Sequence, residues 1–387
     1  MKILYVHGNS VIKAIAEAME RAGYEVEIYP KKEAGVFLEE EIVEEVADYI
    51  KRRGITHIVS LHLISNLAMA AYQTGIKYLS IIWDAPYYKI YSRFGYMENC
   101  YFSVFDKTDC QRFIHDGIPH VVYQPLAVDR EEAVKWNVRQ NDYLHDVCFV
   151  GNLYEESLYD DYVQTLPEIL REYFDSIFAE AAFRWDGINR IYGKTGEAVL
   201  EYMKTACPGF RLINPWDIDD VQYFEAFYLS RKLANIERIS ILNLLAQKYK
   251  VALYTGSKKD TQKLQNVQIY PFADSRTMAP LIFNSSKINL NITLHSIENG
   301  TTQRVLDVME AGGFVLSTYR PETAELFQED KEIVMFRSPE ELVEKIGYYL
   351  EHDEVRQRIA AAGHEKVLRC YTYDIKMKAF LEWVDSK

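Results

Sequence analysis

The sequence predicts an α/β protein of two units, each built on a parallel sheet. Three observations predict this class. The chain has 387 residues, which is more than one domain at about 150 residues per domain. Short apolar runs alternate with amphipathic helical segments in both halves. A polar and charged stretch at residues 129–143 separates the halves, so we expect an N-terminal unit at 1–133 and a C-terminal unit at 143–370.

The first half repeats a strand and helix rhythm from its first residues. Its strands are short and rich in Val, Ile and Tyr, and the helical segments have apolar residues at intervals of three and four. Gly23 and Gly54 punctuate two of the helical segments. The predicted strands are 3–6, 25–29, 57–60, 78–83, 101–105 and 121–123. The predicted helices are 11–22, 39–53, 65–74 and 109–116.

The second half begins a new α/β series, which is interrupted early by a long helical segment. Residues 155–229 have helical periodicity and little strand character, so we interpret them as a helical insertion. The series then continues to a helical tail that lacks a strand. The predicted strands are 146–150, 251–255, 267–270, 288–292, 314–317 and 333–336. The predicted helices are 236–248, 276–284, 301–310, 322–327, 339–352, 354–366 and 371–384.

Composition excludes several functional classes. Hydrophobic residues are 48% and charged residues 26%, which is the balance of a globular protein rather than a disordered or fibrous one. The net charge of −13 disfavours nucleic acid as a partner. The N-terminus lacks the apolar core of a secretion signal, and no run reaches the roughly 20 apolar residues of a spanning helix. With five widely spaced cysteines, we expect a cytoplasmic protein with reduced thiols, no metal-binding cysteine motif and no integral membrane segment.

The turn after the predicted strand 288–292 is the strongest candidate for binding an anion. Asn299, Gly300, Thr301 and Thr302 precede a predicted helix, where an N-cap and free N–H groups can hold a phosphate. One turn later, Arg304 can bind a diphosphate and Asp307 a ribose diol. The alternative is structural: Thr301 caps the helix and Arg304 pairs with Asp307 or Asp330. The following Gly312 and Gly313 allow a tight turn into the next strand.

Two further loops of the second half occupy the same position after a strand. Gly151 and Asn152 follow one predicted strand, and Gly256 and Ser257 follow another. Open parallel sheets bind ligands at the carboxyl ends of their strands, so these residues are candidates for the same site. Each lone glycine is a weak signal, because no G-x-G-x-x-G is present. Phe272, beyond the strand at 267–270, is a further candidate.

In the first half, two loops place polar groups at strand ends. Asp84 follows an apolar strand and can accept a proton or bind a hydroxyl, whereas its alternative role is a turn residue before Pro86. His7 has the equivalent position after the first strand, with a structural loop histidine as its alternative. Tyrosines cluster beyond Asp84 and suit a sugar or peptide acceptor, although core packing explains at least half of such residues. They are Tyr87, Tyr88, Tyr91 and Tyr96.

These segments resemble a known family. The run from Ile288 through Gly300 to Ser317, with Arg304 and Asp307 inside it, resembles the C-terminal half of the CgeB-like (spore maturation protein) glycosyltransferases of the GT-B superfamily. The resemblance continues in residues 340–350 and 358–363, and in the first half in residues 104–107 and 124–129. It covers most of the chain outside the insertion.

The resemblance implies a fold and an activity. The fold is two Rossmann-like domains facing a cleft, with the final helix, residues 371–387, crossing back to complete the N-terminal acceptor domain. The activity is sugar transfer from a nucleotide diphosphate, most readily a UDP-sugar, to a hydroxyl of a protein, glycan or small molecule in a bacterial cytoplasm. The C-terminal domain would bind the donor, with no required metal or other cofactor. Arg304 matches the position that grips the diphosphate, and Asp307 the acidic position that holds the ribose.

Two departures from the family pattern affect the predicted site. Asp307 replaces the commoner glutamate, so the ribose contact needs a closer helix or a bridging water. No basic residue follows the turn at Asn152, which leaves Lys258 as the candidate for the second phosphate cation. For the acceptor proton, Asp84 is the first candidate base and His7 the second, unless a retaining reaction gives that proton to the leaving phosphate.

Two other functions remain open at this point. One is a non-catalytic GT-B-like binding or structural protein of a surface or spore assembly, and the other is a nucleotide-sugar epimerase. The sequence does not identify the donor sugar and base, the acceptor, the stereochemistry, the oligomeric state or the role of the insertion.

Overall fold

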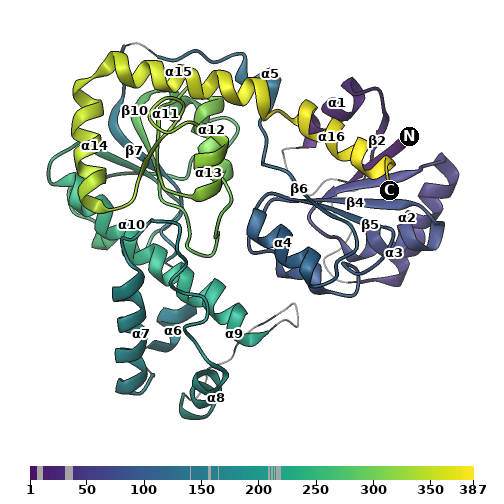
Figure 1. Ribbon diagram of the computed structural model, residues 1–387, viewed down its shortest axis with the longest axis horizontal. Helices are drawn as coiled ribbons and strands as arrows, with labels where there is room; N and C mark the ends of the chain where they lie inside the picture. Colours follow the sequence, from purple (N-terminus) through teal and green to yellow (C-terminus); the bar gives the residue numbers. More distant parts are fainter. Residues whose placement is uncertain are drawn as a thin grey trace. The chain divides into compact units, whose positions relative to one another are not determined.

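A computed structural model describes residues 1–6, 12–30, 38–139, 141–155, 158–163, 165–207, 210, 212, 214 and 219–387. Two compact units are present: residues 1–130 together with 370–387, and residues 131–369. Each contains a six-stranded parallel sheet covered by helices (Figure 1), so the predicted α/β class with parallel sheets is confirmed.

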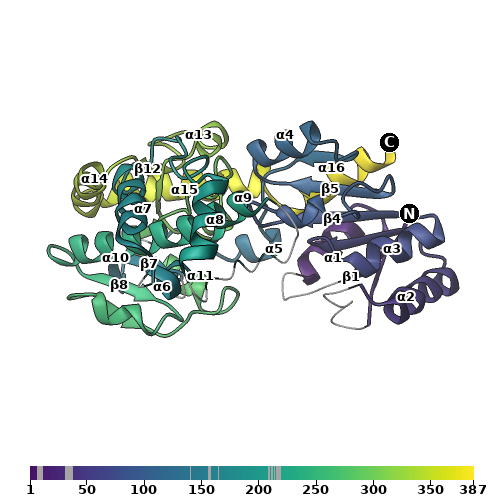
Figure 2. The same ribbon diagram turned by 90° about the horizontal axis from the view of Figure 1, so that it is seen from below.

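The first unit has the strand order β2-β1-β3-β4-β5-β6. Alternate residues of β1 point to opposite faces, which gives the sheet two apolar faces: Ile3 and Tyr5 pack on α1 and α16, and Leu4 and Val6 face α2 and α3. In Figure 2 the yellow helix α16 lies among the elements of this unit. The strands are β1 Lys2–Val6, β2 Glu25–Ile28, β3 His57–Leu61, β4 Lys77–Ile82, β5 Cys100–Val104 and β6 Val121–Tyr123. The helices are α1 Ile12–Arg21, α2 Glu40–Arg53, α3 Ser65–Thr74, α4 Lys107–His115 and α16 Tyr373–Asp385, with a 3-10 turn at Tyr88–Tyr91.

The second unit has the strand order β12-β11-β10-β7-β8-β9. Helices α10, α14 and α15 pack on one face of its sheet, with Val147 and Phe149 of β7 in that core. Helices α11 and α12 pack on each other and on β10. The strands are β7 His145–Val150, β8 Val251–Tyr254, β9 Gln268–Tyr270, β10 Ser286–Asn291, β11 Val315–Thr318 and β12 Val334–Phe336. The α/β helices are α10 Ser230–Ala246, α11 Ala279–Asn284, α12 Gln303–Glu310, α13 Pro321–Leu326, α14 Pro339–Glu351 and α15 Asp353–Cys370; α5 Arg130–Ala133 precedes β7, and a 3-10 turn lies at Asp260–Lys263.

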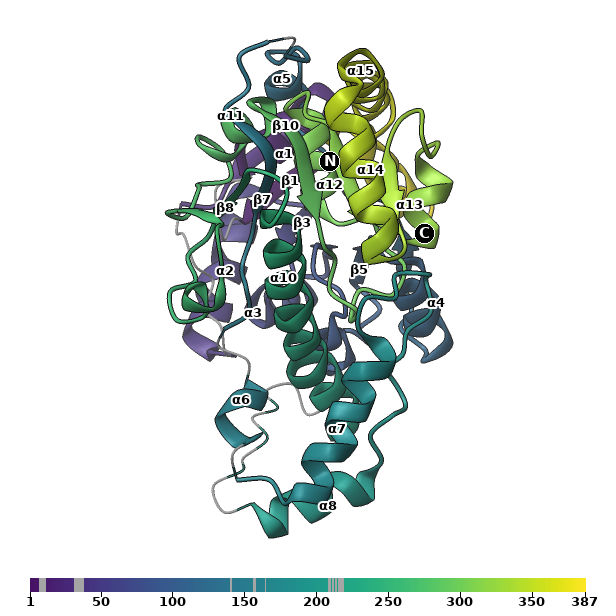
Figure 3. The same ribbon diagram turned by 90° about the vertical axis from the view of Figure 1, so that its left-hand side faces the viewer.

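Between β7 and β8 the chain forms a helical layer with its own core. Phe174, Phe224 and Leu233 belong to that core, which joins the layer to the start of α10. Figure 3 shows α7 beside α10 and α8 at the end distant from the sheet. The elements are α6 Leu158–Val163, α7 Glu168–Ala181, α8 Glu197–Ala206, α9 Asp220–Tyr223 and a π-helical turn at Phe224–Leu229 that runs directly into α10. Because of this continuity, α10 begins six residues before the predicted start at 236.

Several other helix starts differ from the prediction, and local hydrogen bonds explain that of α11. Helix α11 begins at Ala279 instead of 276, because the Asp274 carboxylate accepts the N–H groups of Arg276 and Thr277 in a turn. Helix α12 begins at Gln303 instead of 301, and its first flanking residue, Thr302, makes no side-chain cap bond. The alternative in which Thr301 caps α12 is therefore wrong.

Gly313 occupies a position with no room for a side chain. A Cβ there would lie 2.8 Å from the Phe283 carbonyl oxygen and 2.9 Å from Asn289 Nδ2. We therefore expect Gly313→Ala to lower the free energy of unfolding by about 1–3 kcal/mol, because the buried backbone must shift. Denaturant unfolding measures this change. Gly196→Ala is the control, since nothing lies within 4 Å of its Cβ position, and a similar loss in both variants would contradict the steric argument.

Candidate functional site

The residues predicted to bind the sugar donor lie at one edge of the second sheet, where its strands end. All pairings in this sheet are parallel, so the loops after β7, β8, β10 and β11 emerge on the same side. In sheets of this kind ligands bind at that edge, next to the helix N-termini. The geometry of these loops determines which predicted residues lie near one another.

The loops after β7 and β8 enclose a cavity of about 300 Å³. Three predicted residues, Asn152, Gly256 and Ser257, line it together with Tyr154, Glu155 and Arg231. The Ser257 hydroxyl accepts the Leu153 N–H at 3.0 Å and donates to Asn152 Oδ1 at 3.3 Å. These bonds tie the two loops together and fix the shape of the cavity.

The cation of this cavity is one that the sequence analysis missed. Arg231 lies in the first turn of α10, and its guanidinium lies 5.2 Å from the Phe227 ring centroid. The predicted cation, Lys258, is exposed and is not among the lining residues; its backbone N–H is bound by Glu155 Oε1 at 2.7 Å. Arg231 was missed because it lies about eighty residues after the β7 turn and before the predicted start of its helix. Phe272 is 71% exposed, with its Cβ 3.9 Å from the Cβ position of Gly256.

The turn at Gly300 is anchored to the start of α13. Asn299 Oδ1 accepts the Glu322 N–H at 2.9 Å, and the Thr301 and Thr323 hydroxyls lie 2.9 Å apart. Thr302 Oγ1 is buried and has no hydrogen-bond partner among the described residues. The predicted residues of this turn are thus held in a fixed conformation ahead of α12.

Arg304 and Asp307 contact each other near the start of α12, three residues apart. Arg304 Nη1 lies 3.4 Å from Asp307 Oδ2, and its guanidinium lies 5.1 Å from the Phe283 ring centroid. Burial raises the pKa of Asp307, against the opposing effect of Arg304, and Gln303 Nε2 donates to its other oxygen at 2.9 Å. The two side chains are 29% and 23% exposed. The Arg304–Asp307 ion pair expected under the structural alternative is present, and both side chains are partly accessible to solvent.

A second arginine, which is buried, connects the segments that follow β7 and β10. Arg238 of α10 is 8% exposed and donates Nη1 to the Asn152 carbonyl at 2.5 Å and Nη2 to the Ile292 carbonyl at 2.6 Å. Burial lowers the pKa of Arg238. Its guanidinium also lies 4.7 Å from the Tyr154 ring centroid, beside the cavity. Arg238 therefore places a positive charge between the loops after β7 and β10.

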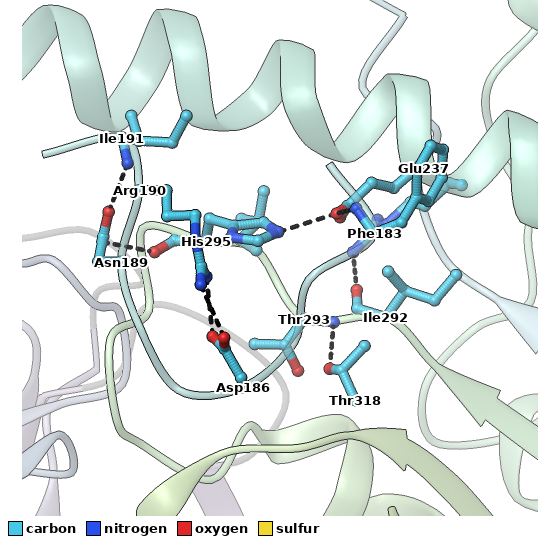
Figure 4. Close-up of polar contacts among 12 residues, drawn as sticks. Phe183, Asp186, Asn189, Arg190, Ile191, Glu237, Ile292, Thr293, His295 and Thr318 are labelled. Carbon is cyan, nitrogen blue, oxygen red and sulfur yellow. Dashed lines mark hydrogen bonds and ion pairs between the residues drawn. The ribbon is translucent and has the colours of Figure 1, made fainter. Parts of the chain in front are cut away.

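The adjacent residue, Glu237, forms a buried pair with His295 (Figure 4). Glu237 Oε1 lies 3.0 Å from His295 Nε2 and also accepts the Phe183 N–H at 2.9 Å. The two side chains are 0% and 4% exposed. Neither residue could be found from the sequence, because Glu237 is one of several charged residues of its helix and the single histidine of the loop lies 58 positions away.

Part of the insertion lies on this edge of the sheet. Asn189 Nδ2 donates to the His295 carbonyl at 3.0 Å, and the Tyr192 hydroxyl donates to the Ser296 carbonyl at 3.2 Å. Figure 4 shows this segment beside His295, with Arg190 and Asp186 forming an ion pair within it. That pair holds the pKa of Asp186 down, to about 2. Residues 189–192 thus contact the loop after β10.

In the first unit, Asp84 lies beside a histidine that the sequence analysis did not single out. His62 follows β3, and its Nε2 lies 3.5 Å from Asp84 Oδ2. The His62 ring stacks on Tyr87 at 5.3 Å, and its backbone has φ +57°, a conformation that few non-glycine residues adopt. Burial lowers the pKa of His62, opposed by the Asp84 charge. His7, the second predicted base, lies outside the described residues.

The tyrosines near Asp84 divide between packing and exposure. Tyr87 and Tyr88 are buried, and the Tyr87 hydroxyl accepts the Leu63 N–H at 2.9 Å. The Tyr91 hydroxyl donates to Asp116 Oδ2 at 2.6 Å, whereas Tyr96 is 44% exposed. Core packing therefore accounts for part of this cluster.

No group of three or more His, Cys, Asp or Glu side chains in the described residues is arranged to hold a metal ion. Across the same parts of the chain, each helix is too short or too polar to span a bilayer.

Comparison with known proteins identifies the fold and a family likeness. Residues 240–382 match a family model described as "Glycosyl transferase-like", and this segment contains His295, Gly300, Arg304 and Asp307. No curated protein sequence matches the chain.

Several solved structures resemble the whole chain. A glycosyltransferase from Rickettsia africae ESF-5 has 11% identity and a TM-score of 0.54, covering 98% of this chain and 97% of that one. Sucrose-phosphate synthase from Thermosynechococcus elongatus has 10% identity and a TM-score of 0.56. Anabaena HepE in complex with UDP-glucose has 12% identity and a TM-score of 0.53. Each of these two matches covers 100% of this chain and 100% of the other chain. The chain has the GT-B fold of these structures, as predicted.

Proposed function

We propose that this protein is a glycosyltransferase that moves a sugar from a nucleoside diphosphate to a hydroxyl acceptor. The observation that carries the proposal is the charge at the carboxyl edge of the second sheet. In a chain of net charge −13, that edge holds Arg231 in the lining of a 300 Å³ cavity, Arg238 between the loops after β7 and β10, and Arg304 after the Gly300 turn. A nucleoside diphosphate has the charge and the size for such a site.

The departure of the diphosphate requires positive charge in fixed positions. Arg304 and the Asn299–Thr302 turn would stabilise the charge that develops on the leaving group, and Arg231 takes the place proposed from the sequence for Lys258. Asp307 would hold the ribose. This arrangement needs no metal ion. The glycosyl transferase-like match and the HepE complex with UDP-glucose support a UDP-sugar as donor, and the sequence resemblance supports the CgeB-like family.

The acceptor proton requires a base, and the pair in the first unit supplies one. An imidazole titrates near the working pH, whereas a carboxylate ordinarily titrates near pH 4. We therefore assign His62 as the base, acting through Nε2, and Asp84, whose Oδ2 lies 3.5 Å from that nitrogen, as the carboxylate that stabilises the imidazolium. This revises the first choice made from the sequence, which was Asp84 itself.

Thermal shift of the full chain with UDP, GDP, TDP and CDP sugars tests the proposed donor. We expect one base to raise the melting temperature, because a ligand that binds the native state stabilises it. Incubation of that donor without acceptor should give at most slow hydrolysis. A new nucleotide sugar would instead identify an epimerase, and the lack of affinity for any nucleoside diphosphate would identify a non-catalytic binding protein.

A further inference from the structure

Lys376 is a buried cation with no anionic partner among the described residues. It lies in α16 of the first unit and is 6% exposed. Its Nζ donates to the Gln124 carbonyl at 3.3 Å and to the Pro125 carbonyl at 2.9 Å. An ammonium has three N–H donors, so one of them is left without an acceptor. A buried charge held only by carbonyl oxygens is expensive unless it is neutralised or compensated.

A cavity lies next to this amine. Its volume is about 170 Å³, and Lys376 lines it together with Gln124 and Pro125, the two residues whose carbonyls it contacts. The rest of the lining is mostly apolar and includes Leu126 and Ile375. Burial alone lowers the pKa of Lys376, to about 7. The amine can therefore be neutral when the cavity is empty and charged when an anion lies beside it.

The size and polarity of the cavity restrict the ligand. An apolar protein cavity of about 150 Å³ accepts a benzene ring. One ammonium can compensate one negative charge, and Lys376 is the one cationic side chain in this lining, so a phosphate dianion would keep an uncompensated charge. The ligand that fits is a small monocarboxylate with an apolar body.

We propose that the cavity between α16 and the segment after β6 binds a small apolar monocarboxylate, whose carboxylate pairs with Lys376. The site lies within the first unit and shares no residue with the proposed donor site. The proposal is therefore independent of the proposed transferase activity.

Calorimetric titration of the full chain with benzoate tests the proposal, with benzamide as the neutral ligand of the same shape. We expect Lys376→Met to weaken benzoate binding by about ten- to a hundredfold, because it removes a charge-assisted hydrogen bond and keeps the side-chain length. Benzamide binding should be weak and equal in both proteins. Lys378→Met is the control, since Lys378 lies in the same helix, is 65% exposed and pairs with Glu382.

Benzoate binding that is unchanged in Lys376→Met, or absent in the wild type, would overturn the proposal. If Lys376→Met does not fold, lysine labelling of the wild-type protein tests the proposal instead. Benzoate should slow reductive methylation of Lys376, followed by mass spectrometry, and leave that of Lys378 unchanged. Equal rates at Lys376 with and without benzoate would equally overturn it.

Discussion

Replacing Arg304 by alanine should leave the fold intact and lower the rate of sugar transfer by about a hundred- to a thousandfold. That is the typical effect of removing one preorganised donor from a developing negative charge. The side chain is 29% exposed and contacts the Asp307 carboxylate and the Phe283 ring. In the variant, Asp307 keeps the hydrogen bond from Gln303 Nε2 and its 23% exposure to solvent. Initial rates of donor consumption measure the effect.

Two further variants make this result specific. Arg304→Lys should restore part of the activity, because it keeps the charge and loses the two-pronged contact. Arg369→Ala removes an exposed arginine in α15 that pairs with Glu365, and it should leave the rate unchanged. Normal turnover by a folded Arg304→Ala protein would contradict the assignment of the diphosphate site to this turn. Loss of melting cooperativity would instead assign Arg304 a structural role.

His62→Asn should lower the rate of transfer by about a hundred- to ten-thousandfold, the range for a general base. The wild-type pH profile should have its acid limb below pH 6.5, because burial lowers the pKa of His62 from that ordinary value. The sign follows from the role: the base must be neutral, so the rate rises as the pH rises through the pKa of His62.

Asp84→Asn tests the pairing of His62 with its carboxylate. The Asp84 charge favours the imidazolium, so its removal should lower the pKa of His62 further and move the acid limb to a lower pH. His57→Asn is the control, since His57 lies at the opposite end of β3. An unmoved limb in Asp84→Asn, or an equal loss in His57→Asn, would contradict the assignment.

The strand and helix order could be predicted because its signals are local. Short apolar runs indicate the strands and apolar residues at intervals of three or four indicate the helices, and the two parallel sheets follow from the alternation of strands with helices. The predicted helix starts were wrong where local interactions change the hydrogen bonding. The Asp274 carboxylate binds the chain in a turn, so α11 begins three residues later than predicted. The helical turn at Phe224–Leu229 runs into α10, so that helix begins at Ser230.

Candidate residues at strand ends could also be predicted in part. Asn152, Gly256 and Ser257 each follow a parallel strand, so their common edge is a consequence of topology, and they line one cavity. Arg231 joins the same cavity from a helix about eighty residues further along the chain than Asn152. No sequence pattern indicates that residues this far apart in the chain lie next to each other.

The sequence by itself determined the class of the fold, the insertion and the strand-end loops, because these depend on contacts between residues close in the chain. Only the tertiary structure decided which distant side chains meet. His62 contacts Asp84 across neighbouring strands, Glu237 contacts His295 across 58 positions, and Lys376 lines a cavity with Pro125 and Gln124, which lie 251 and 252 positions earlier. Such pairs depend on sheet order and helix packing, which fix the spatial neighbours of a residue independently of its neighbours in sequence.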